Sequence, residues 1–285
     1  MDFIKMHGLG NDFVCLDHFL SSPEINYSEA ARRLCHRQLG IGGDGLIVVL
    51  PSDKADARMR IFNPDGSEPE MCGNGIRCFA RYVYDRGYVP KETMTVETLA
   101  GILTIKLEVK NRKFEAATVC MGKPVLEPKL IPVITDREGP IIEQEIEVCG
   151  HKLLFTPVSM GNPHCVIFVD DFDRLEFELL GPALEKHPFF PQKTNVEFVK
   201  IENPSELTMK VWERGAGPTL ACGTGACASQ VAAVLTGRAE RKTTIHLPGG
   251  DLQIEWGSDN LIYMTGPANY VFQGQILEDT LPDNL

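Results

Sequence analysis

Short apolar stretches, most of them alternating with polar residues, follow one another along the chain. A period of two residues is typical of half-buried strands. In the first half these stretches are residues 3–6, 13–16, 46–50, 58–62, 93–97, 101–108 and 113–121. In the second half they are residues 141–148, 153–158, 165–169, 196–201, 208–212, 243–247, 252–256, 261–265 and 270–277. The pattern predicts a protein built mainly from short strands.

Four further segments have the character of helices: residues 28–39, 76–84, 177–186 and 226–235. Ser28 is expected to cap the first, since its hydroxyl can accept a backbone N–H. The two helices of residues 76–84 and 226–235, set among so many strands, fit neither an alternating βαβ sheet nor a sandwich. We therefore predict a mixed α/β fold of the α+β type. In each half, a mostly antiparallel, barrel-like sheet surrounds a central helix, a place that the apolar residues 226–235 suit better than residues 76–84.

The two halves repeat the same order of residues at an offset of about 150. Residues 59–63 resemble residues 209–213, Cys15 matches Cys165, Thr93 matches Thr243, and Gly10-Asn11 matches Gly161-Asn162. Gly45 falls opposite Asn195, and residues 121–124 resemble residues 265–267. Matches that keep one order along the chain indicate a duplicated unit and two pseudo-symmetric halves.

The proline-containing stretch of residues 123–139 is the best candidate for the crossing between the halves. The last strand is expected to pair back with the first half. We therefore predict a discontinuous N-terminal domain of residues 1–121 with 269–285, and a C-terminal domain of residues 122–268. The active site is expected in the cleft between them.

Composition excludes several classes of function. The 285 residues carry a net charge of -11, which disfavours binding to nucleic acid. No apolar run is long enough to span a membrane, and no signal peptide is visible at the N-terminus. The nine cysteines have no zinc-site spacing. We expect reduced thiols in the cytoplasm and no bound metal.

Two short turns carry the candidate chemistry. Cys72 and Cys222 each begin a Cys-Gly-X-Gly sequence that leads into a predicted helix, and the two are 150 positions apart. Glycines at a helix start leave its first N–H groups open to an anion. The same N–H groups stabilise a thiolate, so the pKa of each thiol is expected to fall. Each turn thus predicts a reactive thiol beside a site for a carboxylate.

Two such thiols facing one substrate carbon can invert it. One thiolate removes a proton while the opposite thiol supplies another, and the negative charge spreads into the adjacent carboxylate. The N–H groups of Gly73, Asn74, Gly223 and Thr224 are placed to stabilise that charge. The other seven cysteines are expected to be buried as small apolar residues.

Other polar residues have two interpretations from the residues alone. His164 is a turn histidine or a base that deprotonates a thiol. Glu213 and Arg214 form a surface ion pair or recognise a substrate. Asn11, Asn63 and Asn195 are turn residues or ligand contacts, and their recurrence in related loops favours contact.

The motifs together resemble one family. They are residues 5–13 (KMHGLGNDF), 63–68 (NPDGSE), 72–78 (CGNGIRC), 159–165 (SMGNPHC), 213–217 (ERGAG) and 221–226 (ACGTGA). Over nearly the whole chain the sequence is similar to the diaminopimelate epimerases, which work without pyridoxal phosphate. The resemblance implies interconversion of LL- and meso-2,6-diaminopimelate in the lysine and peptidoglycan pathway, with no cofactor.

The resemblance also implies a role for each site residue. Cys72 and Cys222 are the acid–base pair, with His164 and Glu213 close to them. The substrate is held by Asn11, Asn63, Asn162, Asn195 and Arg214 and by the backbone of Gly73, Asn74, Gly223 and Thr224. Family members are often homodimers. One departure is Gly45, where some members carry glutamine, so no side-chain contact is assigned there.

Three alternatives stay open at this point. A proline racemase or hydroxyproline epimerase also uses two thiols, but its substrate has no second amino-acid end. It therefore has less need of the cluster Asn63, Asn195, Glu213 and Arg214, which favours a diamino diacid. A binding protein would capture an amino acid without turnover. A thiol-redox sensor would form a reversible disulfide between Cys72 and Cys222.

Overall fold

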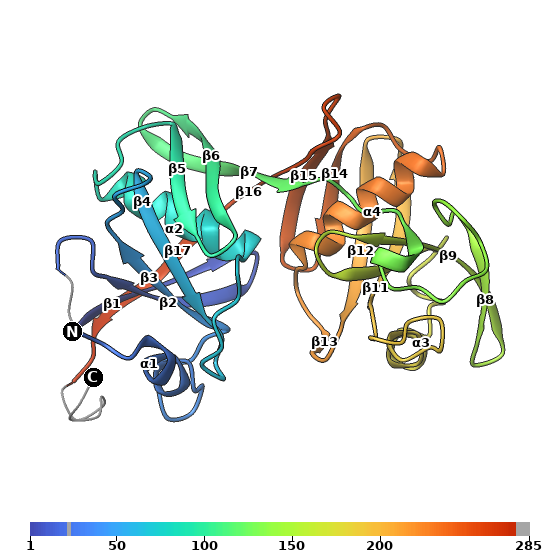
Figure 1. The fold of residues 1–285 in the computed structure, drawn as a ribbon, viewed down its shortest axis with the longest axis horizontal. Coiled ribbons are helices and arrows are strands. Elements are labelled where there is room, and N and C mark those ends of the chain that lie inside the picture. The colour runs from blue at the N-terminus through green and yellow to red at the C-terminus, as the bar shows by residue number, and fades with distance from the viewer. Residues whose placement is uncertain (22–23, 278–285) are drawn as a thin grey trace. The chain divides into compact units, whose positions relative to one another are not determined.

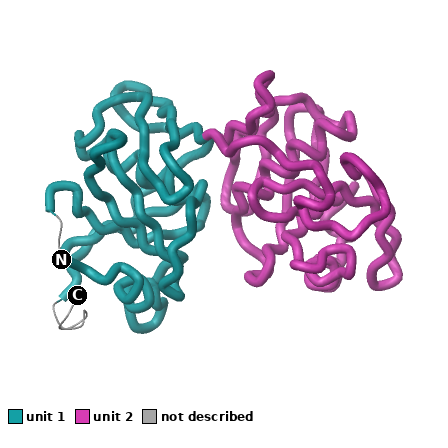
Figure 2. The backbone as a smooth tube through the Cα atoms, viewed as in Figure 1, with its two compact units in different colours: residues 1–119, 265–285 teal, residues 120–264 magenta. Residues whose placement is uncertain are grey.

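The computed structural model describes residues 1–21 and 24–277. The chain divides into two compact units, residues 1–119 with 265–285 and residues 120–264 (Figure 2). It passes between them twice, within strand β7 (Lys113–Gly122) and within strand β16 (Ile262–Gly266). Of the predicted N-terminal domain, residues 278–285 lie outside the described part of the chain.

The first unit is a sheet of short strands with one long helix against it (Figure 1). Its other strands are β1 (Asp2–Gly8), β2 (Asn11–Asp17), β3 (Gly45–Leu50), β4 (Ala57–Phe62), β5 (Thr93–Thr98), β6 (Gly101–Lys110) and β17 (Asn269–Gln275). They pair in the order β17-β1-β2-β3-β4-β5-β6-β7. Helix α2 (Gly73–Asp85) packs against β1, β3, β4 and β6, so the sheet curves around it.

The second unit has the same plan. Its strands are β8 (Gln144–Val148), β9 (His151–Ser159), β10 (Pro163–Phe168), β11 (Asn195–Asn203), β12 (Glu206–Glu213), β13 (Gly217–Pro218), β14 (Lys242–Leu247) and β15 (Gly250–Trp256). They pair in the order β8-β9-β10-β11-β12-β14-β15, and β13 pairs with β12. Helix α4 (Gly223–Leu235) contacts six of these strands, from β9 to β15.

The two sheets alternate their strand directions identically. In the series β1 to β6 the pairings are antiparallel, parallel, antiparallel, parallel and antiparallel. The series β9-β10-β11-β12-β14-β15 repeats this order. The predicted mixed α/β fold with two pseudo-symmetric halves and one central helix in each is therefore confirmed. Among the described strands, each sheet wraps its helix without closing into a barrel.

The two central helices differ in the kind of side chain that they bury. In α4 the residues from Gly225 to Ala233 are all buried, as its small apolar side chains predict. In α2 the guanidinium of Arg77 is completely buried. It donates to the carbonyls of Gly73 and Pro267 and to Oδ1 of Asn74, at 3.0, 3.1 and 2.9 Å. A buried charge is tolerated when its donors are satisfied.

Shorter helices lie outside the central ones: α1 (Tyr27–Leu34), α3 (Phe177–Glu185) and the single 3₁₀ turn Pro128–Leu130. Two details of the predicted helix at residues 28–39 are wrong. Its N-cap is Asn26, whose Oδ1 accepts the N–H of Glu29 at 3.2 Å, whereas Ser28 donates to the carbonyl of Gly66. The helix ends at Leu34 because the chain folds back, with Ile41 and Gly42 donating to the carbonyl of Leu34.

Candidate active site

Cys72 is the N-cap residue of α2. Its backbone is extended (φ -138°, ψ 120°), and its Sγ accepts the N–H of Gly75 at 3.4 Å. The sulfur thus occupies the position that a serine or aspartate oxygen takes at most helix starts. The first-turn N–H groups and the helix dipole act on this sulfur and on the space beside it.

Asn11 reaches Cys72 from a neighbouring turn. Leu9 and Gly10 both have positive φ, 57° and 86°, and they join β1 to β2 in a two-residue hairpin with Gly8 paired to Asn11. The Oδ1 atom of Asn11 lies 3.9 Å from Sγ of Cys72 and accepts Nδ2 of Asn74 at 3.1 Å. Three of the predicted site residues therefore meet at the start of α2.

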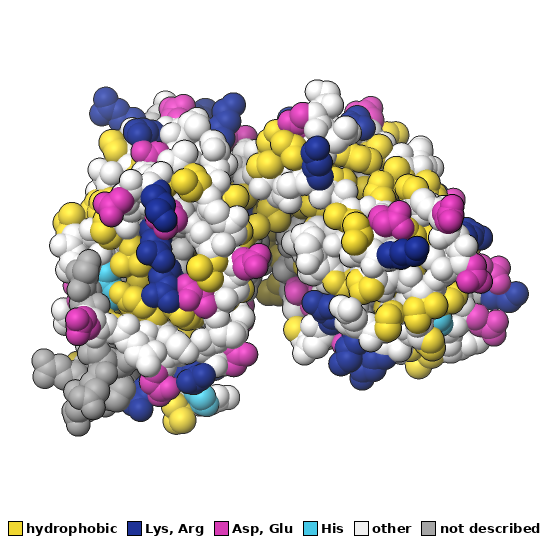
Figure 3. Space-filling view, viewed as in Figure 1, with side chains coloured by type: hydrophobic (Ala, Val, Ile, Leu, Met, Phe, Trp, Pro, Cys, Tyr) yellow, Lys and Arg dark blue, Asp and Glu magenta, His cyan; other side chains and the backbone are white. Residues whose placement is uncertain are grey.

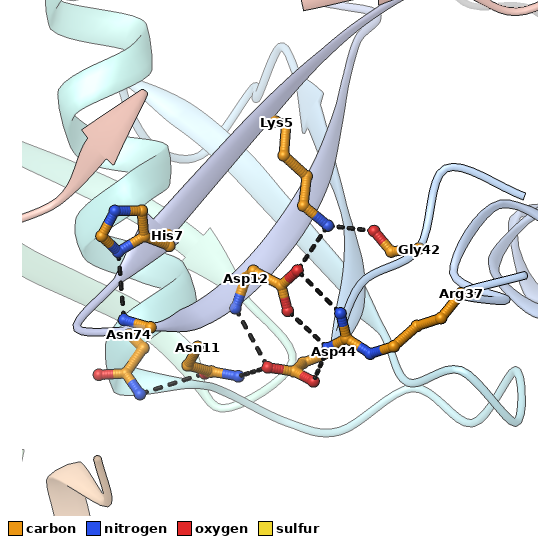
Figure 4. A network of polar contacts seen from close by, with 9 residues as sticks. Lys5, His7, Asn11, Asp12, Arg37, Gly42, Asp44 and Asn74 are labelled. Carbon is orange, nitrogen blue, oxygen red and sulfur yellow. Dashed lines mark hydrogen bonds and ion pairs between the residues drawn. The ribbon is translucent and has the colours of Figure 1, made fainter. Parts of the chain in front are cut away.

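A network of charged side chains contacts Asn11 through Asp44 (Figure 4). Asp44 accepts Nδ2 of Asn11 at 2.9 Å and the N–H of Asp12 at 3.1 Å. Arg37 bridges the carboxylates of Asp12 and Asp44, at 2.8 and 2.7 Å. Lys5, almost completely buried, pairs with Asp12 at 2.7 Å. Although burial opposes ionisation, hydrogen bonds from Arg37 and Lys5 hold the pKa of Asp12 well below its ordinary value.

Cys222 repeats the cap in the second unit. Its backbone is extended (φ -124°, ψ 108°), and its Sγ accepts the N–H of Gly225 at 3.4 Å, the same distance as in the first unit. The hydroxyl of Thr224 lies 3.5 Å from this sulfur. The side chain is buried. The duplicated sequence thus gives the same sulfur geometry twice.

The prediction that the helix start lowers the thiol pKa is wrong for Cys222. Burial raises its pKa well above the ordinary value, and the carboxylates of Glu213 and Glu197 raise it further. The hydroxyl of Thr224 and the N–H of Gly225 act in the opposite direction but do not offset these effects. The surroundings of Cys222 therefore favour its neutral thiol form.

His164 lies in a buried hydrogen-bonded chain beside α4. Its Nδ1 is 2.7 Å from Oε1 of Glu197, and its Nε2 is 3.0 Å from Oδ1 of Asn162. His164 and Glu197 are both completely buried. A Cβ atom at Gly225 would lie 2.7 Å from Oε1 of Glu197, so the glycine leaves room for this carboxylate.

Asn195 and Glu185 fix the loop that carries Arg214. Asn195 donates to the carbonyl of Pro163 at 2.8 Å and accepts the N–H of Arg214 at 2.9 Å. Glu185, at the end of α3, accepts the N–H of Gly215 at 3.1 Å. The amide of Asn195 therefore bonds backbone groups, while the side chain of Arg214 is exposed and reaches the carbonyl of Gln192.

Two predicted residues form hydrogen bonds within their own turns. Asn63 donates to the hydroxyl of Ser67 at 2.9 Å in the turn after β4. Glu213 accepts the hydroxyl of Thr219 across the turn that joins β12 to β13. Glu213 is nevertheless near enough to Cys222 to raise the pKa of its thiol.

The sequence did not single out Asp44, Glu185 or Glu197. Asp44 lies in a glycine-rich segment between the predicted helix of residues 28–39 and the predicted strand of residues 46–50, and Glu197 lies within a predicted strand. The one available signal for Glu197 was Gly225, whose missing side chain makes the space for it. In the described part of the chain, no group of three or more His, Cys, Asp and Glu side chains is arranged to hold a metal ion. None of the described helices is long and apolar enough to cross a membrane.

Comparison with known proteins gives full-length relatives. The family model described as "Diaminopimelate epimerase" matches residues 3–127 and 156–271. A diaminopimelate epimerase of Desulfitobacterium hafniense is 65% identical, with 99% of this chain and 100% of the relative covered. One of Moorella thermoacetica is 56% identical, with coverages of 96% and 98%.

Solved structures share the fold at low identity. A PhzF-family phenazine biosynthesis protein of Bacillus anthracis has a TM-score of 0.70 at 17% identity, with 97% of this chain and 99% of the other covered. A probable proline racemase of Agrobacterium radiobacter has a TM-score of 0.69 at 15% identity, with coverages of 99% and 94%. These likenesses show a common architecture.

Proposed function

The chain belongs to the diaminopimelate epimerase family, and we propose that Cys72 and Cys222 are the acid–base pair of its reaction. It epimerises LL-2,6-diaminopimelate to the meso form, a step that the family supplies to lysine and peptidoglycan precursor synthesis. The observation that carries the assignment is the repeated sulfur geometry. Both cysteines cap a 13-residue helix, and both accept the N–H of the third residue along at 3.4 Å.

The proposed chemistry is a proton exchange at one α-carbon. A thiolate breaks the C–H bond and takes its proton, and the electron pair is delocalised into the α-carboxylate. The other thiol then donates its proton to the opposite face of the carbon. The carbon is inverted, one sulfur has gained a proton and the other has lost one, so no oxidant or reductant is needed.

The starts of α2 and α4 supply the electrostatic part of this proposal. The N–H groups of Gly73, Asn74, Gly223 and Thr224 belong to the first helical turns, which have no partners within the helix. Donors of this kind stabilise the charge that develops on a carboxylate, and each typically contributes on the order of 10²- to 10³-fold in rate.

The other predicted residues have supporting roles in the proposal. His164 and Glu213 lie near the reacting groups, and Asn11, Asn63, Asn162, Asn195 and Arg214 recognise the substrate. Because the guanidinium of Arg214 is exposed, its contribution is to binding. Arg214→Ala is expected to raise KM for diaminopimelate with little change in stability, and an unchanged KM would count against this role.

Exchange of the α-proton in heavy water tests the proposed pair. The wild type should incorporate deuterium into LL-diaminopimelate and should leave proline unlabelled, whereas a binding protein would label neither. Cys72→Ala and Cys222→Ala should each abolish epimerisation while circular dichroism stays unchanged. Cys149→Ala, which removes an exposed thiol of the second unit, is the matched control and should be fully active.

We also infer a homodimer in the cytoplasm. Tyr270, Val271 and Phe272 are consecutive on β17, and they are 38%, 55% and 49% exposed. Exposed apolar side chains on this strand suit a surface covered by a second copy. Val271→Glu is expected to give a monomer in sedimentation experiments, and an unchanged mass would exclude this surface. A reducing compartment suits a reaction that needs two free thiols.

A further inference from the structure

We propose that Asp44 is a positioning residue that fixes the orientation of the Asn11 amide beside Cys72. The inference deepens the proposed function, since it concerns the same site. It rests on a chain of hydrogen bonds in the first unit. Arg77 at one end and Asp44 at the other determine which amide atom of each asparagine donates and which accepts. Figure 4 shows Asn74, Asn11 and Asp44 of this chain of hydrogen bonds.

The first fixed end is Arg77. A guanidinium has only donors, so the atom that meets its Nη2 at 2.9 Å must be the carbonyl oxygen of Asn74. The amide nitrogen of Asn74 consequently points the other way, towards Asn11, and donates to Asn11 Oδ1 at 3.1 Å. Because Arg77 is completely buried, this end of the chain has no room to rotate.

The second fixed end is Asp44. An ionised carboxylate has only acceptors. It therefore takes the amide nitrogen of Asn11, at 2.9 Å, and leaves the carbonyl oxygen of Asn11 facing α2. The oxygen and nitrogen of an amide have nearly the same shape, so these partners alone set its orientation. Both ends demand the same orientation.

The consequence falls on Cys72. The Asn11 atom that lies 3.9 Å from its Sγ is an acceptor and not a donor. In its thiol form, Cys72 thus points its S–H at Asn11, while the sulfur accepts the N–H of Gly75. These two contacts hold the sulfur in one rotamer at the start of α2. Asp44 thus acts on Cys72 through Asn11.

Arg37 and Asp12 keep Asp44 in place. Arg37 bonds Oδ1 of Asp44 at 2.7 Å, while the N–H of Asp12 and Nδ2 of Asn11 share Oδ2. Asp44 itself is 41% exposed, so its replacement leaves the core intact. A loss of activity in an Asp44 variant can therefore be attributed to a changed orientation of the Asn11 amide and not to unfolding of the protein.

Asp44→Asn is the decisive variant, since it keeps the shape and adds a donor that competes for Asn11. A hydrogen bond to a charged group contributes enough to expect about a tenfold to hundredfold loss of kcat/KM. Asp56→Asn is the matched control in the same unit. Asp56 also bonds a cationic side chain, Lys91 at 2.6 Å, and a backbone N–H, that of Thr95 at 3.0 Å.

The orientation itself can be observed by NMR of protein with ¹⁵N-labelled asparagine. The Asn11 side-chain amide should change its proton shifts in Asp44→Asn and keep them in Asp56→Asn. Asp44→Ala, which removes the acceptor altogether, should change both activity and spectrum in the same direction. Unchanged Asn11 resonances, or a kcat/KM equal to that of Asp56→Asn, would overturn the inference. An inactive wild type would instead refute the proposed function, because the NMR result does not depend on turnover.

Discussion

The Nδ1 atom of His164 lies 2.7 Å from Oε1 of Glu197, and both side chains are completely buried. The second carboxylate oxygen of Glu197 is also buried, and it has no hydrogen-bond partner among the described residues. A buried carboxylate is costly unless it is paired. His164 is thus the partner that stabilises the buried Glu197 carboxylate beside the start of α4, and Glu197 in turn orients the imidazole ring.

Glu197→Ala should be strongly destabilising, because removal of one partner from a buried pair typically costs about 3–5 kcal/mol. Urea denaturation of the purified variant measures this loss. Glu202→Ala is the matched control on the same strand, since Glu202 forms a surface ion pair with Lys200 and should matter little. Equal losses in the two variants would contradict the importance of the buried pair.

Gly225→Ala and Gly75→Ala should differ although they occupy repeat-related positions. At Gly225 a Cβ would lie 2.7 Å from Oε1 of Glu197, an atom that His164 holds in place. At Gly75 the nearest atom is a methyl of Ile61 at 3.0 Å, which can rotate away.

Alanine favours a helix over glycine by about 1 kcal/mol, so propensity alone predicts a gain at both sites. We expect Gly75→Ala to be nearly neutral, and Gly225→Ala to lose about 1–3 kcal/mol through overpacking. Denaturation midpoints and turnover of the two variants provide the measurement. A stabilised and active Gly225→Ala would show that Glu197 moves freely.

The raised pKa of Cys222 predicts slow alkylation. The thiolate is the nucleophile, and a pKa well above about 9 leaves little thiolate near neutral pH. In a Cys72→Ala background, the rate of iodoacetamide labelling at Cys222 should keep rising beyond that pH. Mass spectrometry of the labelled peptides gives the rate, with the exposed Cys149 as an internal reference. A plateau near neutral pH would disagree with the burial described above.

The lowered pKa of Asp12 predicts a loss of stability in acid. A carboxyl with a depressed pKa in the folded protein stabilises it above the unfolded value of about 3.9, and this contribution disappears as the pH falls through the folded value. The stability difference between wild type and Asp12→Asn should therefore be largest near neutral pH and should shrink steadily as the pH falls below about 4. Denaturation curves across this range test the trend, and a constant difference would speak against ionic pairing with Lys5 and Arg37.

Much of the architecture was predictable because the chain repeats itself. The offset between Cys72 and Cys222 predicted two equivalent helices, and α2 and α4 both have 13 residues and cap the same way. The alternation of apolar residues predicted the strands that face a core. Residues 28–39 were less predictable, because the fold-back after Leu34 depends on backbone contacts that leave no composition signal.

Candidate site residues could be named from the sequence where residue type alone carries the chemistry. Cysteines, histidine and asparagines in glycine-rich turns were visible as candidates. Asp44 and Glu197 were not, because a carboxylate in a loop or a strand is usually exposed and nothing local marks it as buried or bridging. The pKa of Cys222 was predicted with the wrong sign because its burial, and the carboxylates of β11 and β12 near it, come from segments outside its own turn.

The pairing of strand β17 with β1 affects the order in which the two units can fold during synthesis. It pairs with β1 from Asp2 to His7, and the terminal amino group donates to the carbonyl of Ile276. The ribosome therefore finishes the contiguous second unit before the first can acquire its last strand. Until then β1 has an open edge, to which a strand of another chain can pair.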